Sequence, residues 1–316
     1  FTSVYLFLGQ NKLSCLFLIK ITKRMKPVFA KILEGAAITT FATKDVQRPF
    51  FSTEFHFHSA CQMTYIVESE GKRIIGDNVS NFASDELTFV GPDLPHVWHN
   101  NNINCPGSAI AETKTSRSLA LYIEPKLMIK LLGHFFQTHK IEAFFSASKR
   151  GLLFRGATKE QLKVKLKKIV QLDYGFEKTI LLLEIIELML STDEFDYLSS
   201  AGYTHNYSPI DNSKIDSIFK FVFNNYTGEI QLDQVAQLSN MSKHSFCRYF
   251  KSRTQKTFVQ FVNEVRISES CRLIAENKHQ ITHIAYACGF NSLSNFNKIF
   301  KSIKGVTPSQ YKSQIR

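Results

Sequence analysis

Polar side chains that can bind a nucleic acid recur on two short segments near the C-terminal end. The segment 243–251 (KHSFCRYFK) spaces its polar residues helically opposite two phenylalanines: Lys243, His244, Cys247, Arg248 and Lys251 oppose Phe246 and Phe250. The segment 293–301 (LSNFNKIFK) repeats this pattern: Ser294, Asn297, Lys298 and Lys301 oppose Phe296 and Phe300. A helix that buries phenylalanines four residues apart leaves its opposite face free to enter a DNA major groove.

The residue types on these two faces suit different contacts with DNA. The guanidinium of Arg248 matches guanine O6 and N7, and the amide of Asn297 matches adenine at two points. Lysines serve guanine or phosphate and give salt-dependent affinity that is blind to sequence. Each residue also has an ordinary alternative role. Lys251 and Lys301 could be solvated only, His244 a bystander, Cys247 a packing residue, and Arg248 an internal ion-pair partner.

The elements that must position these side chains form a weak internal repeat. Residues 230–251 and 280–301 each read as a short amphipathic helix, a tight turn and a second helix. Ala236 and Ala285 let the two helices of each unit cross closely, which is the helix-turn-helix pattern. Ser242 is the expected N-cap of the second helix in the first unit, and either Asn291 or Ser292 in the second. The free N–H groups of these helix starts favour phosphate.

The charge of the chain is concentrated around this repeat. The 316 residues carry a formal net charge of +12. Residues 211–316 hold 15 lysines and arginines against 7 acidic residues, whereas 25–210 hold 20 of each. A neutral stretch beside a basic C-terminal segment indicates that only this segment meets a polyanion. Double-stranded DNA is the predicted partner.

The N-terminal part has a different pattern. Short apolar or alternating runs (MTYIVE, RIIGD, ELTFVG, SLALYIE) between 40 and 115 predict strands, with hairpin turns at EGK (70–72) and GDN (76–78). From about 125 the spacing becomes helical, and one segment (181–190) is apolar on more than one face. Such a helix is either fully buried or packs against a second subunit, and we expect a homodimer. Residues 193–210 read as a linker. The predicted class is α+β, with a β-barrel or sandwich followed by helices.

Two further features limit the class of protein. Residues 1–24 are apolar and basic but interrupted, too broken for a membrane span and with basic residues misplaced for a signal peptide. We interpret them as an extension outside the fold. Six cysteines without CxxC spacing give neither a disulfide framework nor a zinc ribbon. Reduced thiols and no membrane segment favour a cytoplasmic location.

The basic segment resembles the DNA-binding domain of AraC/XylS-type transcription regulators. Four stretches carry the resemblance: LDQVAQLSNMSKHSFCRYFK, FVQFVNEVRISESCRLI, IAYACGFNSLSNFNKIFK and GVTPSQY. The resemblance implies seven helices in 211–316, with two recognition helices joined by a linker helix over about 257–276. It also implies that the recognition helices enter successive major grooves on one face of DNA. Arg266 matches the family's arginine in the linker helix, with a structural role in holding the two units together.

Residues 25–124 resemble the cupin-type barrel that many AraC-type regulators carry before their DNA-binding domain. His56, His58, Gln62 and His96 match the cupin metal motifs, with Asn100 at the fitting distance and Gln62 where glutamate is usual. An amide oxygen is a poor fourth ligand for a divalent metal, so the resemblance implies a metal-free effector pocket. His56, His58, Gln62, His96 and Trp98 would line this pocket. Trp98 would stack on a sugar ring or fill the core.

The sequence therefore predicts a ligand-responsive transcription regulator that senses a small molecule, with a carbohydrate as one candidate. Its predicted organisation is a cupin-like sensor (25–124), a helical dimerisation region with linker (125–205) and a double helix-turn-helix domain (211–316). No cofactor and no enzyme activity are predicted, because the chain has no nucleophile elbow, phosphate-binding glycine loop or suggestive carboxylate pair. Two alternatives remain: a metal-dependent cupin enzyme with an accessory DNA-binding module, and an architectural DNA-binding protein without a ligand.

Overall fold

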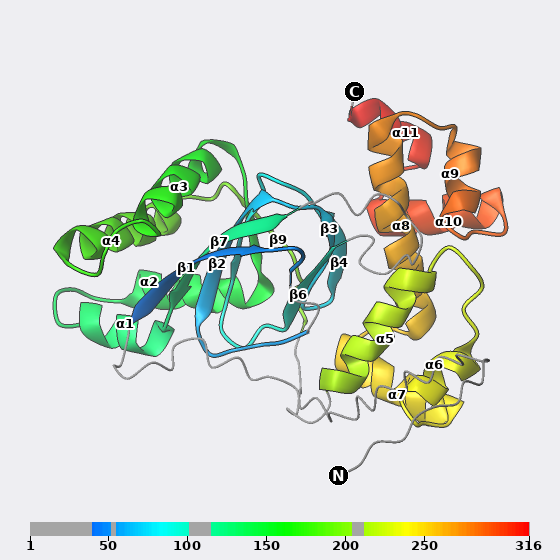
Figure 1. Cartoon of the computed structure of the whole chain (residues 1–316), viewed down its shortest axis with the longest axis horizontal. Helices are drawn as coiled ribbons and strands as arrows, with labels where there is room; N and C mark the ends of the chain where they lie inside the picture. Colours follow the sequence, from blue (N-terminus) through cyan, green and yellow to red (C-terminus); the bar gives the residue numbers. More distant parts are fainter. Residues whose placement is uncertain (1–39, 52–54, 101–114, 204–211, 316) are drawn as a thin grey trace, which may run out of the picture.

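The chain folds into a sheet-containing N-terminal part and an all-helical C-terminal part. The computed structural model describes residues 40–51, 55–100, 115–203 and 212–315 (Figure 1). The predicted α+β class, with strands first and a helical domain last, is confirmed. The predicted extension 1–24 and part of the predicted linker lie outside the described residues. No helix in the described ranges is long and apolar enough to cross a membrane.

The larger sheet has six antiparallel strands in the order β1-β7-β2-β5-β8-β9. Its strands are β1 (Phe41–Arg48), β2 (Cys61–Glu68), β5 (Leu87–Val90), β7 (Ser116–Ile123), β8 (Leu152–Phe154) and β9 (Phe195–Tyr197). β9 falls inside the segment 193–210, so the linker prediction is wrong for 195–197. This strand is only three residues long and depends on pairing with β8, a partner that short-range composition does not reveal.

The smaller sheet pairs β3 (Gly71–Ile75) with β4 (Asn78–Phe82) and β6 (His96–Asn100), in the order β4-β3-β6. The predicted GDN hairpin turn joins β3 to β4, with Gly76 at φ +58°. The EGK turn is not a hairpin. β2 is already flanked by β5 and β7, so β3 has no free edge beside it and enters the second sheet.

The two sheets pack face to face around a shared apolar cluster. Ile66 and Val90 of the larger sheet contact the layer formed by Ile75, Phe82 and Trp98 of the smaller sheet. A single bridge between His56 and His96 supplements the smaller sheet. The expected closed barrel is not present among the described residues, where the strands instead form two separate sheets.

Four helices cover the outer face of the larger sheet (Figure 1). They are α1 (Pro125–Leu132), α2 (His139–Ala147), α3 (Gly156–Ile169) and α4 (Phe176–Leu190), and a 3-10 turn, Ser148–Arg150, follows α2. α4 buries Leu182, Ile185 and Met189 against α3 and the sheet. Its other side exposes Phe176, Ile180 and Leu183, so this helix is apolar on two sides, as the sequence indicated.

The C-terminal domain contains seven helices within 212–315, the number that the resemblance implies. They are α5 (Asn212–Asn225), α6 (Leu232–Leu238), α7 (Lys243–Thr254), α8 (Phe258–Glu276), α9 (Ile281–Ala287), α10 (Leu293–Lys304) and α11 (Pro308–Gln314). α8 is shared by two cores. Its first half packs Phe261 and Val265 with α5–α7, and its second half packs Ile267 and Ile274 with α9–α11.

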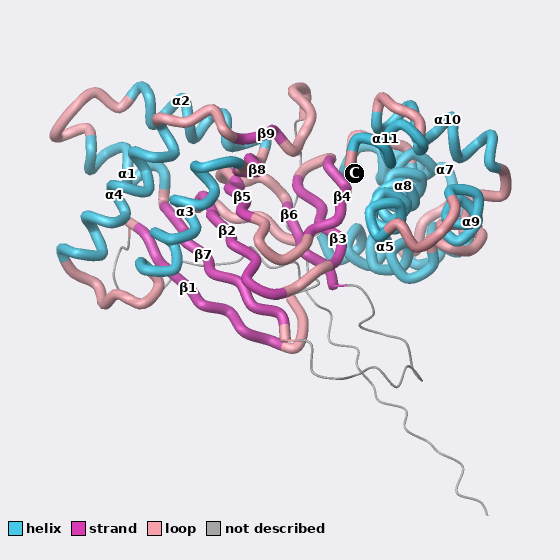
Figure 2. The backbone as a smooth tube through the Cα atoms, turned by 90° about the horizontal axis from the view of Figure 1, so that it is seen from above, coloured by secondary structure: helices cyan, strands magenta, loops and turns pink. Residues whose placement is uncertain are grey.

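The smaller sheet lies against the helical domain. Figure 2 shows β3 and β4 next to α5 and α8, with α7, α9 and α10 on the far side. Ile74 and Val97 join the core of the first helical unit, and the ring of Phe55 meets that of Phe219 edge-on at 5.1 Å. The two parts of the chain are therefore held together by apolar packing as well as by the polar contacts described below.

Candidate nucleic-acid interface

The first helix-turn-helix unit is formed by α6 and α7. Asn240 takes φ +53° in the turn, and Ser242 caps α7 by accepting a hydrogen bond from the Ser245 amide at 3.3 Å, as predicted. Phe246 and Phe250 are fully buried beneath the helix. The sequence positions this helix through one capping serine and two core rings, and its opposite face is left to solvent.

The five predicted contact residues of α7 lie on that exposed face. Lys243, His244, Cys247, Arg248 and Lys251 are all exposed. Lys243 is the first residue of α7, and its ammonium pairs with Asp233 of α6 at 2.7 Å. Arg248 has no ion pair within the described residues, so the internal pairing considered for it does not occur there. Its guanidinium is free to reach a base edge or a phosphate.

The second unit is formed by α9 and α10 and is built in the same way. Ser292, rather than Asn291, caps α10 by accepting from the Asn295 amide at 3.4 Å. Phe296 and Phe300 are fully buried. The exposed side carries the predicted contact residues Ser294, Asn297, Lys298 and Lys301.

Glycine is required in the turn of the second unit. Gly289 has φ +83°, and a Cβ atom there would lie 2.5 Å from the Tyr226 carbonyl oxygen and 2.8 Å from that of Thr227. The turn therefore presses directly on the loop that follows α5. This close approach joins the second unit to the first.

The linker helix α8 holds the two units in one body. Thr257 and Gln260 form a capping box at its start, and Asn277 ends it with φ +53°. Arg266 donates to the carbonyl oxygens of Tyr226 and Gly228, both at 2.8 Å. Arg266 thus ties α8 to the loop on which the Gly289 turn rests, which is the structural role that the family resemblance implied.

Between the two sheets of the N-terminal part, the predicted pocket residues form a histidine cluster. The ligand nitrogens of His56, His58 and His96 lie within 4.8 Å of one another. His58 Nδ1 and His96 Nδ1 donate to the carbonyl oxygens of Ala60 and Leu94, each at 2.7 Å. Both Nε2 atoms therefore carry lone pairs when the rings are neutral.

Burial keeps the rings of His58 and His96 neutral. Desolvation, followed by the nearby His56, lowers the pKa of His58 to about 4. The same two causes, with His58 added, lower the pKa of His96 well below its usual value. At neutral pH His58 and His96 therefore each offer an unprotonated Nε2.

The amide of Gln62 occupies the point where these nitrogens converge. Its Oε1 lies 2.9 Å from His58 Nε2 and 3.2 Å from His96 Nε2, and its Nε2 lies 2.8 Å from Thr64 Oγ1. Two lone-pair nitrogens cannot donate to an oxygen, but a half-turn of the amide lets its NH₂ group donate to both rings. The Thr64 hydroxyl then donates to the amide oxygen. Three histidines could hold a divalent metal, yet Gln62 already satisfies two of them without one.

Trp98 lies beside this cluster, 7% exposed, and packs in the core between the sheets. Four buried polar atoms on this inner side have no hydrogen-bond partner among the described residues. They are Trp98 Nε1, Arg73 Nε, Glu86 Oε1 and Thr88 Oγ1. Arg73 and Glu86 pair at 2.8 Å, so the unpartnered donor and acceptor belong to one buried ion pair. The sequence motifs did not single out Arg73, Glu86 or Thr88, because only the pairing of strands and the packing of the two sheets bring these residues together.

Comparisons with known proteins identify the helical domain. Residues 235–314 match the family described as "Helix-turn-helix domain". An uncharacterized HTH-type transcriptional regulator from Bacillus subtilis, YdeC, is 30% identical over 103 residues, which span 33% of this chain and 35% of that protein. The HTH-type transcriptional activator RhaS from Mannheimia succiniciproducens is 25% identical over 160 residues, which span 50% of this chain and 56% of that protein. The match thus spans less than two thirds of either relative.

Among solved structures, ToxT from Vibrio cholerae O395 covers 88% of this chain, with 16% sequence identity and a TM-score of 0.35. A score this low supports no inference about shared architecture or function. The family match, over residues 235–314, covers both α7 and α10. Residues 235–314, in the C-terminal third of the chain, therefore form a helix-turn-helix domain.

Proposed function

We propose that the chain is a sequence-specific, DNA-binding transcription regulator of the AraC/XylS type. The observation that carries the proposal is the paired architecture of α7 and α10. Each helix is capped by a serine, anchored by two buried phenylalanines and open on a face rich in cationic and amide groups. Two such faces on one linker helix suit two successive major-groove segments of one duplex. The protein acts in the cytoplasm and needs no cofactor.

The N-terminal part is proposed to sense a small molecule between its two sheets, as a cupin-like domain. The buried Arg73–Glu86 pair offers one unused donor and one unused acceptor, and Trp98 and Thr88 add further unused groups among the described residues. A ligand that satisfies all of them must both donate and accept, while adding no net charge to a balanced pair. Hydroxyl groups do this, which favours a neutral polyhydroxylated effector such as a carbohydrate. The histidines with Gln62 and Trp98 form one wall of this site.

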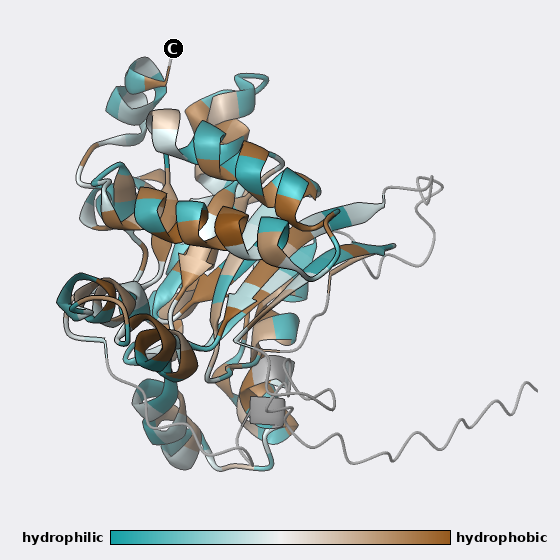
Figure 3. Cartoon of the chain, turned by 90° about the vertical axis from the view of Figure 1, so that its left-hand side faces the viewer, coloured by the Kyte–Doolittle hydropathy of each residue, from teal (hydrophilic) through white to brown (hydrophobic). Residues whose placement is uncertain are grey.

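The outer face of α4 is proposed to form the homodimer contact. Phe176, Ile180 and Leu183 are 90%, 56% and 40% exposed, and they follow one another at spacings of four and three residues. Figure 3, viewed from the side of these helices, shows hydrophobic residues interspersed with hydrophilic ones on their outer surface. Lys165 and Lys168 on α3 lie in ion pairs with Glu184 and Glu177 on α4, so each copy presents both charges beside the apolar stripe. A twofold contact can match these opposite signs.

Selection from a random-sequence duplex library with the full chain tests the proposal. We expect one enriched motif with two half-elements about one helical turn apart, about 34 Å. Enrichment of no motif, with equal binding to all duplexes, would favour the architectural alternative. Metal analysis of the purified protein, together with a His56→Ala variant, tests the enzyme alternative. Motif binding that survives in the metal-free protein and in this variant would reject it.

A further inference from the structure

A buried ion pair joins the smaller sheet to the linker helix. Lys72 Nζ of β3 lies 2.8 Å from Glu269 Oε2 of α8, and the two side chains are 2% and 8% exposed. The same ammonium lies 4.9 Å from the centre of the Tyr226 ring. Glu269 is also bound by Arg272, at 2.6 Å. A lysine of the N-terminal part thus takes its carboxylate partner from the C-terminal domain.

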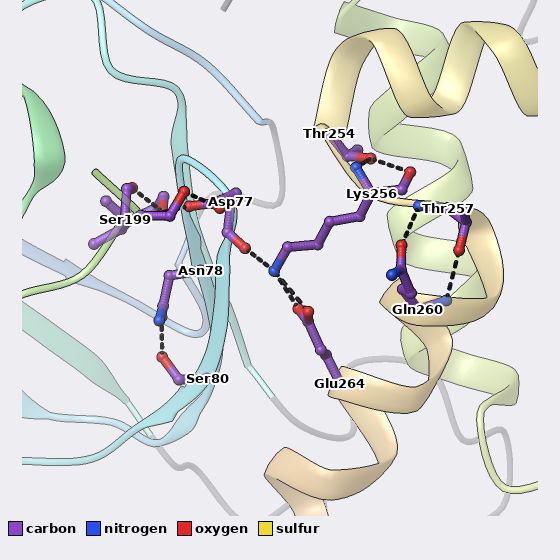
Figure 4. Close-up of polar contacts among 11 residues, drawn as sticks. Asp77, Asn78, Ser80, Ser199, Thr254, Lys256, Thr257, Gln260 and Glu264 are labelled. Atoms are coloured by element: carbon purple, nitrogen blue, oxygen red, sulfur yellow. Dashed lines mark hydrogen bonds and ion pairs between the residues drawn. The ribbon is translucent and has the colours of Figure 1, made fainter. Parts of the chain in front are cut away.

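Two hydrogen bonds flank this ion pair on the same side of α8. Asn81 of β4 donates from Nδ2 to the Ser268 carbonyl oxygen at 2.7 Å. Lys256, just before α8, donates to the Asp77 carbonyl oxygen at 2.5 Å and pairs with Glu264 at 2.7 Å. Figure 4 shows the Lys256 side chain extended between the hairpin tip and the helix. We call these three contacts, Lys72–Glu269, Asn81–Ser268 and Lys256–Asp77, the interdomain clamp.

The hairpin tip that receives Lys256 is itself anchored. Both carboxylate oxygens of Asp77 accept hydrogen bonds from Ser200, from its amide at 3.0 Å and from its hydroxyl at 2.7 Å. Ser199 donates to the Ile75 carbonyl oxygen at 2.9 Å. The hairpin between β3 and β4 that contacts Lys256 is therefore held in place by hydrogen bonds to residues 199 and 200.

The clamp meets α8 where its two cores adjoin. Val265 belongs to the core of the first helix-turn-helix unit and Ile267 to that of the second. The clamped residues of the helix run from Glu264 to Glu269, across this junction. Bending or twisting of α8 at this point would change the orientation of α7 relative to α10. A restraint here therefore acts on the geometry of both reading helices together.

The clamp does not cover the reading faces. The predicted contact residues on α7 and α10 are exposed while the clamp is closed, and α7, α9 and α10 lie away from β3 and β4 (Figures 1 and 2). The closed arrangement therefore leaves the reading faces accessible to DNA. Its effect must come through the angle between the two units.

From these contacts we propose that the interdomain clamp preorganises the two helix-turn-helix units for DNA, with Lys72 as its principal positioning residue. If the clamp already fixes the junction in α8, binding to DNA does not have to order it. The complex then loses less conformational entropy than it would with a free junction. The N-terminal part then favours specific binding without touching DNA. An effector that displaces β3 or β4 would weaken binding by releasing α8. The inference rests on the proposed DNA-binding function.

The test compares full-length Lys72→Met and Glu269→Gln with the wild type. Each variant removes one charge of the clamp at similar side-chain length. Arg117→Met is the matched control, because it removes an exposed ion pair with Asp45 in the larger sheet, 42% and 41% exposed. The measurements are the Kd for the duplex selected by the wild type and hydrogen exchange of the α8 amides without DNA. Thermal unfolding shows that each variant is folded.

We expect Lys72→Met and Glu269→Gln to bind the selected duplex at least about fivefold more weakly, a typical coupling between two sites. The double variant should be no weaker than the weaker single variant, because both remove one contact. Amides of 264–269 should exchange faster, and Arg117→Met should match the wild type.

Unchanged or tighter binding by the folded variants would overturn the clamp. If Lys72→Met does not fold, Glu269→Gln decides alone. A wild type that selects no sequence would instead reject the proposed function.

Discussion

Lys72 and Glu269, 197 residues apart in the chain, form an ion pair of 2.8 Å with both side chains almost fully buried. Removing one member of such a pair leaves an uncompensated charge, which costs about 3–5 kcal/mol in buried sites. Replacing either residue alone should therefore weaken the contact between the two parts.

Arg248→Ala should relax the sequence preference at one operator position. The exposed guanidinium on α7 matches a guanine, and one such pair contributes about 1–3 kcal/mol of discrimination. Repeating the duplex selection with the variant should show one position losing its preference while the others remain. Loss of preference at all positions would contradict this orientation of α7.

Lys301→Ala should weaken binding to all duplexes alike. Lys301 lies in the last turn of α10 and is exposed, where a phosphate contact carries no sequence information. The slope of log K against log salt should become smaller by about 0.9, the value for one phosphate. Titrations at several salt concentrations measure it. An unchanged slope would mean that Lys301 is only solvated.

Gly289→Ala should destabilise the C-terminal domain by about 1–3 kcal/mol, because alanine is strained at φ +83° and its Cβ would meet the Tyr226 carbonyl oxygen. Urea unfolding measures this loss. Gly175→Ala is the control, since Gly175 is extended and a Cβ there meets nothing within 4 Å. Equal stability of the two variants would contradict the close packing of the turn.

Acid should loosen the contact between the two parts. His99 of β6 lies 5.3 Å from the Phe223 ring of α5, and burial, with Lys220 and Lys72 nearby, lowers its pKa from 6.5 to about 4. A lowered histidine pKa means that the folded form prefers the neutral ring. Its stabilising contribution is complete above about pH 6.5 and is lost as the pH falls through about 4, up to about 3 kcal/mol.

Unfolding measured between pH 7 and pH 4 checks this, with His99→Gln as the variant. The variant should lose less stability across this range than the wild type. His244→Gln, at an exposed position on α7, is the control and should retain the wild-type slope. A His99→Gln slope equal to that of the wild type would show that other groups dominate.

Ile180→Glu should shift the protein from dimer to monomer without unfolding it. Ile180 is 56% exposed at the middle of the apolar stripe on α4, and a carboxylate there would be buried in the proposed contact. We expect Ile180 to act as a hot spot of the interface, whose loss costs about 2 kcal/mol or more. Sedimentation equilibrium measures the dissociation constant. Val259→Glu, an exposed aliphatic position on α8, is the control.

The helical domain could be predicted from sequence because its signals are local. Phenylalanines four residues apart and a serine before each reading helix predicted the buried rings and caps that the structure shows. The strands β2, β3, β5 and β7 were likewise visible as apolar runs. The pairing of the strands could not be predicted, because the partners are far apart in the chain, as Phe41 of β1 and Ile123 of β7 are. Arg73 and Glu86 likewise meet only because the two sheets pack together.

Some residues of the candidate sites could be predicted from sequence and others could not. The exposed residues of α7 and α10 follow from helical spacing alone, and the histidine cluster followed from a motif. The contacts of Lys72, Asn81 and Lys256 with distant partners left no local trace, because a buried lysine and a solvated one look alike in sequence. Only the packing of the two parts distinguishes them.

Because α8 contributes to two cores, its number of residues fixes the rotation of one helix-turn-helix unit relative to the other. An α-helix advances about 1.5 Å and rotates about 100° per residue. A single inserted residue between Val265 and Ile267 would swing α10 by more than a quarter turn about the axis relative to α7, out of phase with the groove it should enter. A substitution in α8 leaves the rotation of α10 relative to α7 unchanged, whereas an insertion or deletion changes it.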